Sequence, residues 1–137
     1  MKEITVEAVA ANIEKVTDFV NGELEALGAP MKAQIQLDVA IDELFGNITH
    51  YAYGGKTGMA TVRFETEGDP LTAVISFIDS GIPFNPLETE EPDTTLSADQ
   101  RKIGGLGIFL VKKTMDAVLY KFSEGQNILT IKKKLVK

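Results

Sequence analysis

Cysteine is absent from this chain of 137 residues. Its absence excludes a disulfide scaffold, a thiolate nucleophile and thiolate zinc sites, and it is compatible with a reducing compartment. Long hydrophobic runs are also missing, because no stretch approaches the ~18 apolar residues that a membrane span needs. The opening residues MKEITVEAV contain no apolar signal region. We therefore expect a soluble, cytoplasmic protein without a membrane segment.

Basic and aromatic residues are scarce as well. Lysine and arginine together number 14 against 20 acidic residues, the net charge is −6, and aromatic residues make up 7% of the chain. Proteins that bind nucleic acids usually carry a basic surface, so we expect no direct nucleic-acid partner. The content of 44% hydrophobic and 25% charged residues is typical of a globular protein. The length is that of one ordinary domain, so we expect a single domain over residues 1–137.

The spacing of apolar residues predicts the order of the secondary structure. Alternation of apolar and polar residues indicates strands, and apolar residues that recur every three or four positions indicate amphipathic helices. Pro30 is suited to the first position of a helix, and Glu124 to Asn127 read as the turn between the last two strands. We expect strands at about 3–8, 59–66, 71–78, 117–123 and 128–136, and helices at about 9–27, 30–52 and 106–115.

This order predicts an α+β fold. Most strands neighbour one another in sequence, which favours a two-layer sandwich: a mixed, mostly antiparallel sheet with helices on one face. Residues 81–103 show no periodicity and hold three prolines and several acidic residues. A structureless loop of ~20 residues in a compact domain tends to be functional or mobile.

The first candidate group for chemistry lies on the second helix. Glu43 and Asn47 are four residues apart and so project from the same side of the helix. An amide oxygen can ligate Mg²⁺, and a neighbouring carboxylate can accept a proton from a hydroxyl group. The alternative is a solvated polar face. Gly46 weakens that alternative, because a glycine costs about 1 kcal/mol in a helix interior relative to alanine.

The second group is the sequence Asp79-Ser80-Gly81, which ends an apolar strand. A carboxylate at a strand end can accept a hydrogen bond from an exocyclic amine, and a bare glycine backbone lets a flat ring come close. The alternative is ordinary turn chemistry.

The third group consists of glycines immediately before the third helix: Gly104, Gly105 and Gly107. Free backbone N–H groups and the helix dipole at such an end make an anion site. The spacing matches neither the Rossmann nor the P-loop pattern. The alternative is a hinge for the preceding loop, and both interpretations can hold together.

Four stretches together resemble a known family: AIDELFGNITHYAY (40–53), DSGIPFNP (79–86), GGLGIFLVKKTMDAV (104–118) and GQNILTIKK (125–133). They resemble the motifs of the GHKL superfamily of ATPases and, within it, the bacterial anti-sigma-factor serine/threonine kinases, which have a histidine-kinase-like ATPase fold. The resemblance spans nearly the whole chain. The sequence departs from the family pattern at two positions. Tyr51 stands where many of these kinases have histidine, and Asn85 stands where aspartate is common. These differences bear on the protein partner and on the lid more than on ATP binding.

The resemblance implies ATP and Mg²⁺ as cofactors and gives each group a role. At the base, Asp79 would accept a hydrogen bond from the adenine amino group, Gly81 would give the ring access, and Thr130 would support adenine through a water. At the phosphates, the amides of the glycines at 104, 105 and 107 would bind oxygen atoms. Residues 87–102 would form the ATP lid.

The resemblance also implies the catalytic groups. Asn47 would ligate the Mg²⁺ ion that bridges the phosphates, and Glu43 would be the general base acting on a protein serine hydroxyl. Arg101 and Lys102 are near enough in sequence to reach the terminal phosphate, although we favour a solvated basic pair. His50, the only histidine, is expected to be structural or exposed, since no nucleophile motif accompanies it.

The expected function is therefore that of a kinase that phosphorylates a small anti-sigma-factor antagonist. Sequestration of a sigma factor and a homodimeric state are further expectations from the resemblance. The alternative is a non-catalytic, nucleotide-binding regulatory module that acts through protein–protein binding. A plain ATPase is less favoured, because such members usually need a second domain to complete the site.

Overall fold

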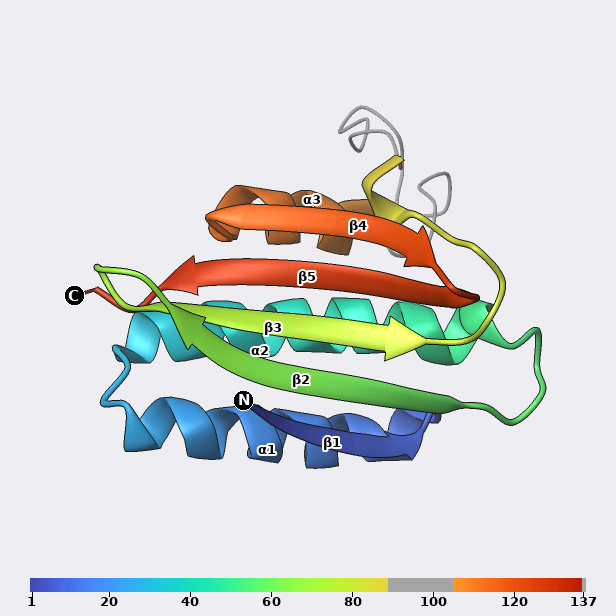
Figure 1. Ribbon diagram of the computed structural model, residues 1–137, viewed down its shortest axis with the longest axis horizontal. Coiled ribbons are helices and arrows are strands. Elements are labelled where there is room, and N and C mark those ends of the chain that lie inside the picture. The colour runs from blue at the N-terminus through green and yellow to red at the C-terminus, as the bar shows by residue number, and fades with distance from the viewer. Residues whose placement is uncertain (89–104, 137) are drawn as a thin grey trace.

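A computed structural model describes residues 1–88 and 105–136 of the chain. One layer is a five-stranded sheet, and the helices pack together against one of its faces (Figure 1). The strands are β1 (Lys2–Glu7), β2 (Met59–Glu67), β3 (Thr72–Asp79), β4 (Ala117–Ser123) and β5 (Gln126–Lys134). The helices are α1 (Ile13–Ala26), α2 (Met31–Asn47) and α3 (Gly105–Thr114), with short helical segments η1 (Ala10–Asn12), η2 (Ile48–Ala52) and η3 (Pro86–Glu88).

The sheet has the strand order β1-β2-β3-β5-β4, and every pair of neighbours is antiparallel. The predicted α+β two-layer sandwich is confirmed. The sheet is antiparallel throughout rather than mixed, because β4 and β5 form a hairpin and β5 inserts beside β3. This insertion brings the end of β3 next to the start of β5, two segments that lie 48 residues apart at Asp79 and Asn127.

The hydrophobic core fills the space between the two layers. In α1, Val16, Val20 and Leu24 recur every four residues and are fully buried. The middle helix, α2, buries Leu37 and Phe45 with their apolar neighbours against the central strands. Burial of such a stripe is what stabilises helices of this length, since isolated helices are marginal in water.

No helix of residues 1–88 or 105–136 covers the other face of the sheet, which carries paired polar side chains. The hydroxyl groups of Thr5 and Thr61 lie 2.9 Å apart, and those of Ser76 and Thr130 lie 3.0 Å apart. Successive residues of a strand point to opposite faces of the sheet. The side chain of Thr130 therefore lies on the face opposite to the helices, whereas its neighbour Leu129 belongs to the core.

Several predicted boundaries are wrong by a few residues, for local reasons. The first helix begins at Ile13, because the preceding residues form the tighter turn η1. Pro30 precedes the second helix instead of opening it, since its ψ of 146° is extended. That helix is regular only to Asn47, and the chain continues to Ala52 as a π-helix.

The turn between β4 and β5 is shorter than predicted. Glu124 and Gly125 both have positive φ, at 53° and 80°, which is the geometry of a two-residue type I′ hairpin turn. The predicted turn extended to Asn127, but Gln126 and Asn127 already belong to β5. Asn127 pairs directly with Asp79 on β3 as a consequence.

Within the described part of the chain, the helices are too short or too polar to cross a membrane.

A partly buried carboxyl group, that of Asp38 on α2, lies beside Asn21 of α1. Asp38 and Asn21 each have a buried Oδ1 atom that finds no hydrogen-bond partner among the described residues. Burial raises the pKa of Asp38 above its ordinary value, and hydrogen bonding with Asn21 lowers it by less. The folded protein therefore holds this proton more tightly than the unfolded chain does.

We expect the substitution Asp38→Asn to stabilise the fold at neutral pH more than at acid pH. In the natural protein, stability falls as pH rises from the ordinary aspartate value of about 4 through the raised value, because the charged form is disfavoured by burial. Urea unfolding of both proteins at pH 4 and pH 7 would measure this difference. A gain that is equal at both pH values would contradict the assignment, and Asp18→Asn on the exposed side of α1 is the control.

Candidate functional site

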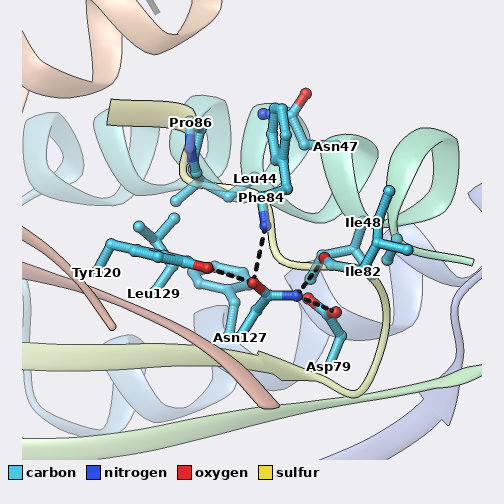
Figure 2. Close-up of a pocket in the computed structure, with 12 residues that line it drawn as sticks. Leu44, Asn47, Ile48, Asp79, Ile82, Phe84, Pro86, Tyr120, Asn127 and Leu129 are labelled. Atoms are coloured by element: carbon cyan, nitrogen blue, oxygen red, sulfur yellow. Dashed lines mark hydrogen bonds between the residues drawn. The ribbon is translucent and has the colours of Figure 1, made fainter. Parts of the chain in front are cut away.

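A pocket opens between the helix layer and the end of the sheet where β3 and β5 meet (Figure 2). It contains about 400 Å³ of empty space with its mouth included, but the centre of a water molecule can occupy only about 30 Å³ of it, so the pocket is narrow in this conformation. The walls are mostly apolar, with a few polar groups, which is the usual composition of a small-molecule site. The lining residues are Leu44, Asn47, Ile48, Ala52, Phe77, Asp79, Ile82, Phe84, Pro86, Tyr120, Asn127 and Leu129.

Asp79, the last residue of β3, lies at the bottom of this pocket. It is only 6% exposed. Its Oδ1 atom accepts hydrogen bonds from the backbone N–H of Gly81 and from Asn127 Nδ2, each at 2.9 Å. The bond from Gly81 is the turn contact that the sequence predicts. It uses Oδ1, and no described residue donates a hydrogen bond to Oδ2.

Gly81 is required by the fold in a way that the sequence did not indicate. A Cβ atom at this position would lie 2.1 Å from the backbone oxygen of Ala52. The next residue, Ile82, donates its N–H to that same oxygen at 2.8 Å. The bare backbone of Gly81 therefore docks the pocket loop against η2, whether or not it also gives a ligand access.

Asn127 is the site residue that the sequence interpretation missed. It is 5% exposed and joins Asp79, the pocket loop and Tyr120 through hydrogen bonds of its side-chain amide (Figure 2). Asn127 could have been found from the register of β5 against β3, which places it opposite Asp79. That register depends on the length of the turn at Glu124, a residue with positive φ although it is not a glycine.

Thr130 does not lie with the other predicted site residues. It is three residues beyond Asn127 on β5 and so points to the opposite face of the sheet, where its hydroxyl group pairs with Ser76. The expected role of Thr130 beside the base is therefore not compatible with its position. The polar group that β5 presents to the pocket is Asn127.

Glu43 and Asn47 lie one turn apart on α2, as their spacing predicts. Asn47 lines the pocket. Glu43 is half-buried, and its Oε1 atom is buried without a hydrogen-bond partner among the described residues. Burial raises the pKa of Glu43, hydrogen bonding with Asn47 lowers it, and the charge of Asp42 raises it further. A buried acceptor without a donor can accept a proton or a hydrogen bond from a bound molecule.

Gly107 packs against Glu43 at the contact between α3 and α2. A Cβ atom at Gly107 would lie 2.1 Å from Glu43 Oε2, so a larger residue here would require the Glu43 carboxylate to move. Gly105 is the first residue of α3. Gly104, the basic pair at 101 and 102 and the predicted lid beyond residue 88 lie outside the described residues. No group of three or more metal-ligating side chains occurs in residues 1–88 and 105–136.

An aromatic pair stands at the mouth of the pocket. The rings of Tyr51 and Phe84 stack with their centroids 5.3 Å apart and their planes at 28°. Both Phe84 and Phe77 line the pocket, but Phe84 is 37% exposed whereas Phe77 is buried and also belongs to the core. His50 is exposed. The sequence predicted that this single histidine would be either structural or exposed.

Comparisons with known proteins identify the family. The sequence matches the histidine kinase-like ATPase domain over residues 6–133. The serine-protein kinase RsbW of Listeria monocytogenes serovar 1/2a is 30% identical over 119 residues, covering 82% of this chain and 74% of that protein. RsbW of Bacillus pumilus is 32% identical over 103 residues, covering 70% and 62%. The chain therefore belongs to the histidine kinase-like ATPase family, in its group of bacterial anti-sigma-factor serine kinases.

Two solved structures have the same fold. The histidine kinase AdeS of Acinetobacter baumannii superposes with a TM-score of 0.51 at 14% identity, covering 100% of this chain and 69% of that chain. The catalytic domain of the histidine kinase ThkA superposes with a TM-score of 0.51 at 11% identity, covering 98% of both chains. At these identities the likeness concerns the fold alone.

We expect Gly107→Ala to destabilise the protein by about 1–3 kcal/mol, because the added methyl group overpacks the contact between α3 and α2. Gly22→Ala is the matched control, since Gly22 also lies in a helix but has no atom within 4 Å of an added Cβ. The control should gain up to about 1 kcal/mol from better helix propensity. Thermal or urea unfolding would compare them, and equal stabilities of the two variants would disprove the tight contact at Glu43.

Proposed function

We propose that this protein binds ATP with Mg²⁺ and transfers the terminal phosphoryl group to a serine or threonine of a small anti-sigma-factor antagonist. One observation carries the proposal. Along one side of α2, the pocket with its buried acceptor Asp79 is followed by Asn47 and then by Glu43, whose Oε1 atom has no hydrogen-bond partner in the described part of the chain. This order matches a nucleotide with its base in the pocket and its phosphates extending towards α3.

The pocket suits an adenine base. Its walls are apolar, which fits the faces of a flat ring, and Asp79 offers a carboxylate oxygen to an exocyclic amine. Because the space is narrow in this conformation, we expect the side chain of Phe84 to move aside when the base enters. Phe84 is suited to such a movement, since it is one of the more exposed residues of the lining.

The phosphate end suits Mg²⁺ bound jointly by protein and nucleotide. The described residues offer Asn47 and no cluster of carboxylates, so an ion held here would take most of its ligands from phosphate oxygens and water. When bound, Mg²⁺ neutralises charge on the transferring phosphoryl group. Asn47 would hold the ion, and Gly105 and Gly107 at the start of α3 would offer backbone N–H groups to the phosphates.

Glu43 is the proposed general base. Its Oε1 atom would accept the proton of the substrate hydroxyl as the oxygen of that hydroxyl attacks phosphorus. The hydroxyl would supply the donor that Oε1 lacks among the described residues. Gly107 positions this carboxylate, because α3 lies directly against it.

The protein partners follow from family membership. The relatives are named serine-protein kinases, which supports phosphoryl transfer to protein. Family membership is also the support for four further parts of the proposal: the antagonist as substrate, a sequestered sigma factor, a homodimeric state and a cytoplasmic location. A nucleotide-binding module without transfer remains the alternative to be separated by experiment.

Titration calorimetry tests the nucleotide site. We expect the natural protein to bind ATP in a Mg²⁺-dependent manner, and Asp79→Asn to bind at least about tenfold more weakly, because a hydrogen bond to a charged acceptor is lost. Asp18→Asn on exposed α1 is the control for the change in charge. Unaltered ATP affinity in Asp79→Asn would remove Asp79 from the site.

Transfer of labelled phosphate to a purified anti-sigma-factor antagonist tests the chemistry. We expect Glu43→Gln to keep ATP affinity and to lose transfer by about 100-fold or more, since general-base catalysis contributes on this order. Glu14→Gln, at an exposed position of α1, should transfer normally. If the natural protein binds ATP and transfers nothing, the regulatory module is the better description; if Glu43→Gln transfers normally, the base is another group.

A further inference from the structure

The side-chain amide of Asn127 is fully used by the protein. Its Nδ2 atom donates to Asp79 Oδ1 at 2.9 Å and to the backbone oxygen of Ile82 at 2.8 Å. Its Oδ1 atom accepts from the backbone N–H of Phe84 at 3.1 Å and from the Tyr120 hydroxyl group (Figure 2). An asparagine amide has two donor hydrogens and two acceptor lone pairs. All four are engaged here, so the amide cannot turn over without breaking the network.

This locked amide also fixes the carboxylate of Asp79. Asn127 and the Gly81 backbone both donate to the same oxygen, Oδ1. Rotation of the carboxylate would break both bonds, and each is a hydrogen bond to a charged group in a buried setting. No described residue donates to Oδ2, so this oxygen can accept a hydrogen bond from a molecule in the pocket.

The locked pair favours one class of base. A purine with an amino group at position 6 presents a donor to Oδ2. A 6-oxopurine presents an acceptor at the same place, and two acceptors facing each other in a buried site cost binding energy. The Asn127 amide cannot compensate, because its donor hydrogens are already committed to Asp79 and Ile82.

We propose that Asn127 is a positioning residue that makes the pocket selective for 6-aminopurines over 6-oxopurines, by holding Asp79 in a single orientation. This inference rests on the proposed binding of ATP and extends it to the choice of base. Asn127 need not touch the nucleotide. Its effect is carried by the carboxylate that it holds and by the loop that it ties at Ile82 and Phe84.

The natural protein alone gives a first test, by calorimetry with Mg²⁺ and three nucleotides. The probes are ATP, ITP, which has a 6-oxo group, and purine riboside triphosphate, which has no group at position 6. A fixed acceptor predicts the affinity order ATP, then purine riboside triphosphate, then ITP, with at least about tenfold between the first and the last. If the carboxylate could adjust, the N1–H of ITP would reach Oδ2, and ITP would bind at least as tightly as purine riboside triphosphate. That order would overturn the proposal.

Two variants then assign the effect to Asn127. In Asn127→Ala, we expect the ratio of ATP to ITP affinity to fall at least about fivefold, because Asp79 loses one of the two donors that hold it. Tyr120→Phe is the matched control: it removes another bond of the same amide and leaves the bond to Asp79. Its ratio should change by less than about twofold. Circular dichroism and thermal unfolding would check that each variant is folded.

The outcomes separate this inference from the proposed function. If the natural protein binds none of the nucleotides at millimolar concentration, the proposed function fails. If it binds ATP and ITP equally, ATP binding stands and the inference is wrong. If folded Asn127→Ala loses affinity for all three nucleotides in equal proportion, Asn127 supports the structure only, which also overturns the inference. If Asn127→Ala does not fold, the affinity order of the natural protein decides.

Discussion

The hydrogen bond between Asp79 and Asn127 is the interaction on which the rest of the site depends. It joins the two central strands at the point where polar side chains enter an otherwise apolar layer. A buried polar group is tolerated only when its partners are in place. This network therefore fixes three features together: the strand register, the backbone path of the pocket loop and the orientation of the Asp79 carboxylate. A change in any one of them would leave a buried polar group without its hydrogen-bond partner.

The second constraint is the close contact between α2 and α3. The pocket lies on one side of α2, and Glu43 lies one turn along the same helix under the start of α3. A rigid helix keeps these two places at a constant separation, because its backbone hydrogen bonds are internal. Gly107 lets α3 approach so closely that a shift of α3 towards α2 would press on the Glu43 carboxylate. Packing would thus link the proposed nucleotide binding at the pocket with the proposed phosphoryl transfer at Glu43.

Much of this arrangement was predictable from the sequence, because it depends on local periodicity. The spacing of Glu43 and Asn47 places both on one side of a helix, and the apolar run before Asp79 predicts a strand that ends in a carboxylate. Asn127 was not predictable in the same way. Its position depends on the strand register, which a turn with positive φ at a glutamate determines and which propensity does not reveal. The resemblance implied a role for Thr130, but the same register turns its side chain to the other face of the sheet.

The two-residue turn at Glu124 and Gly125 has a consequence for how this chain can vary in length. Side chains alternate between the faces of a strand, so one inserted residue in the turn, if the hairpin kept its new register, would turn the whole of β4 or β5 over relative to its neighbour. Asn127 and Tyr120 would then no longer meet on the same side. Loops elsewhere on the surface tolerate insertions well. At this hairpin, by contrast, we expect an insertion or deletion in the turn to be selected against as strictly as a substitution in the pocket.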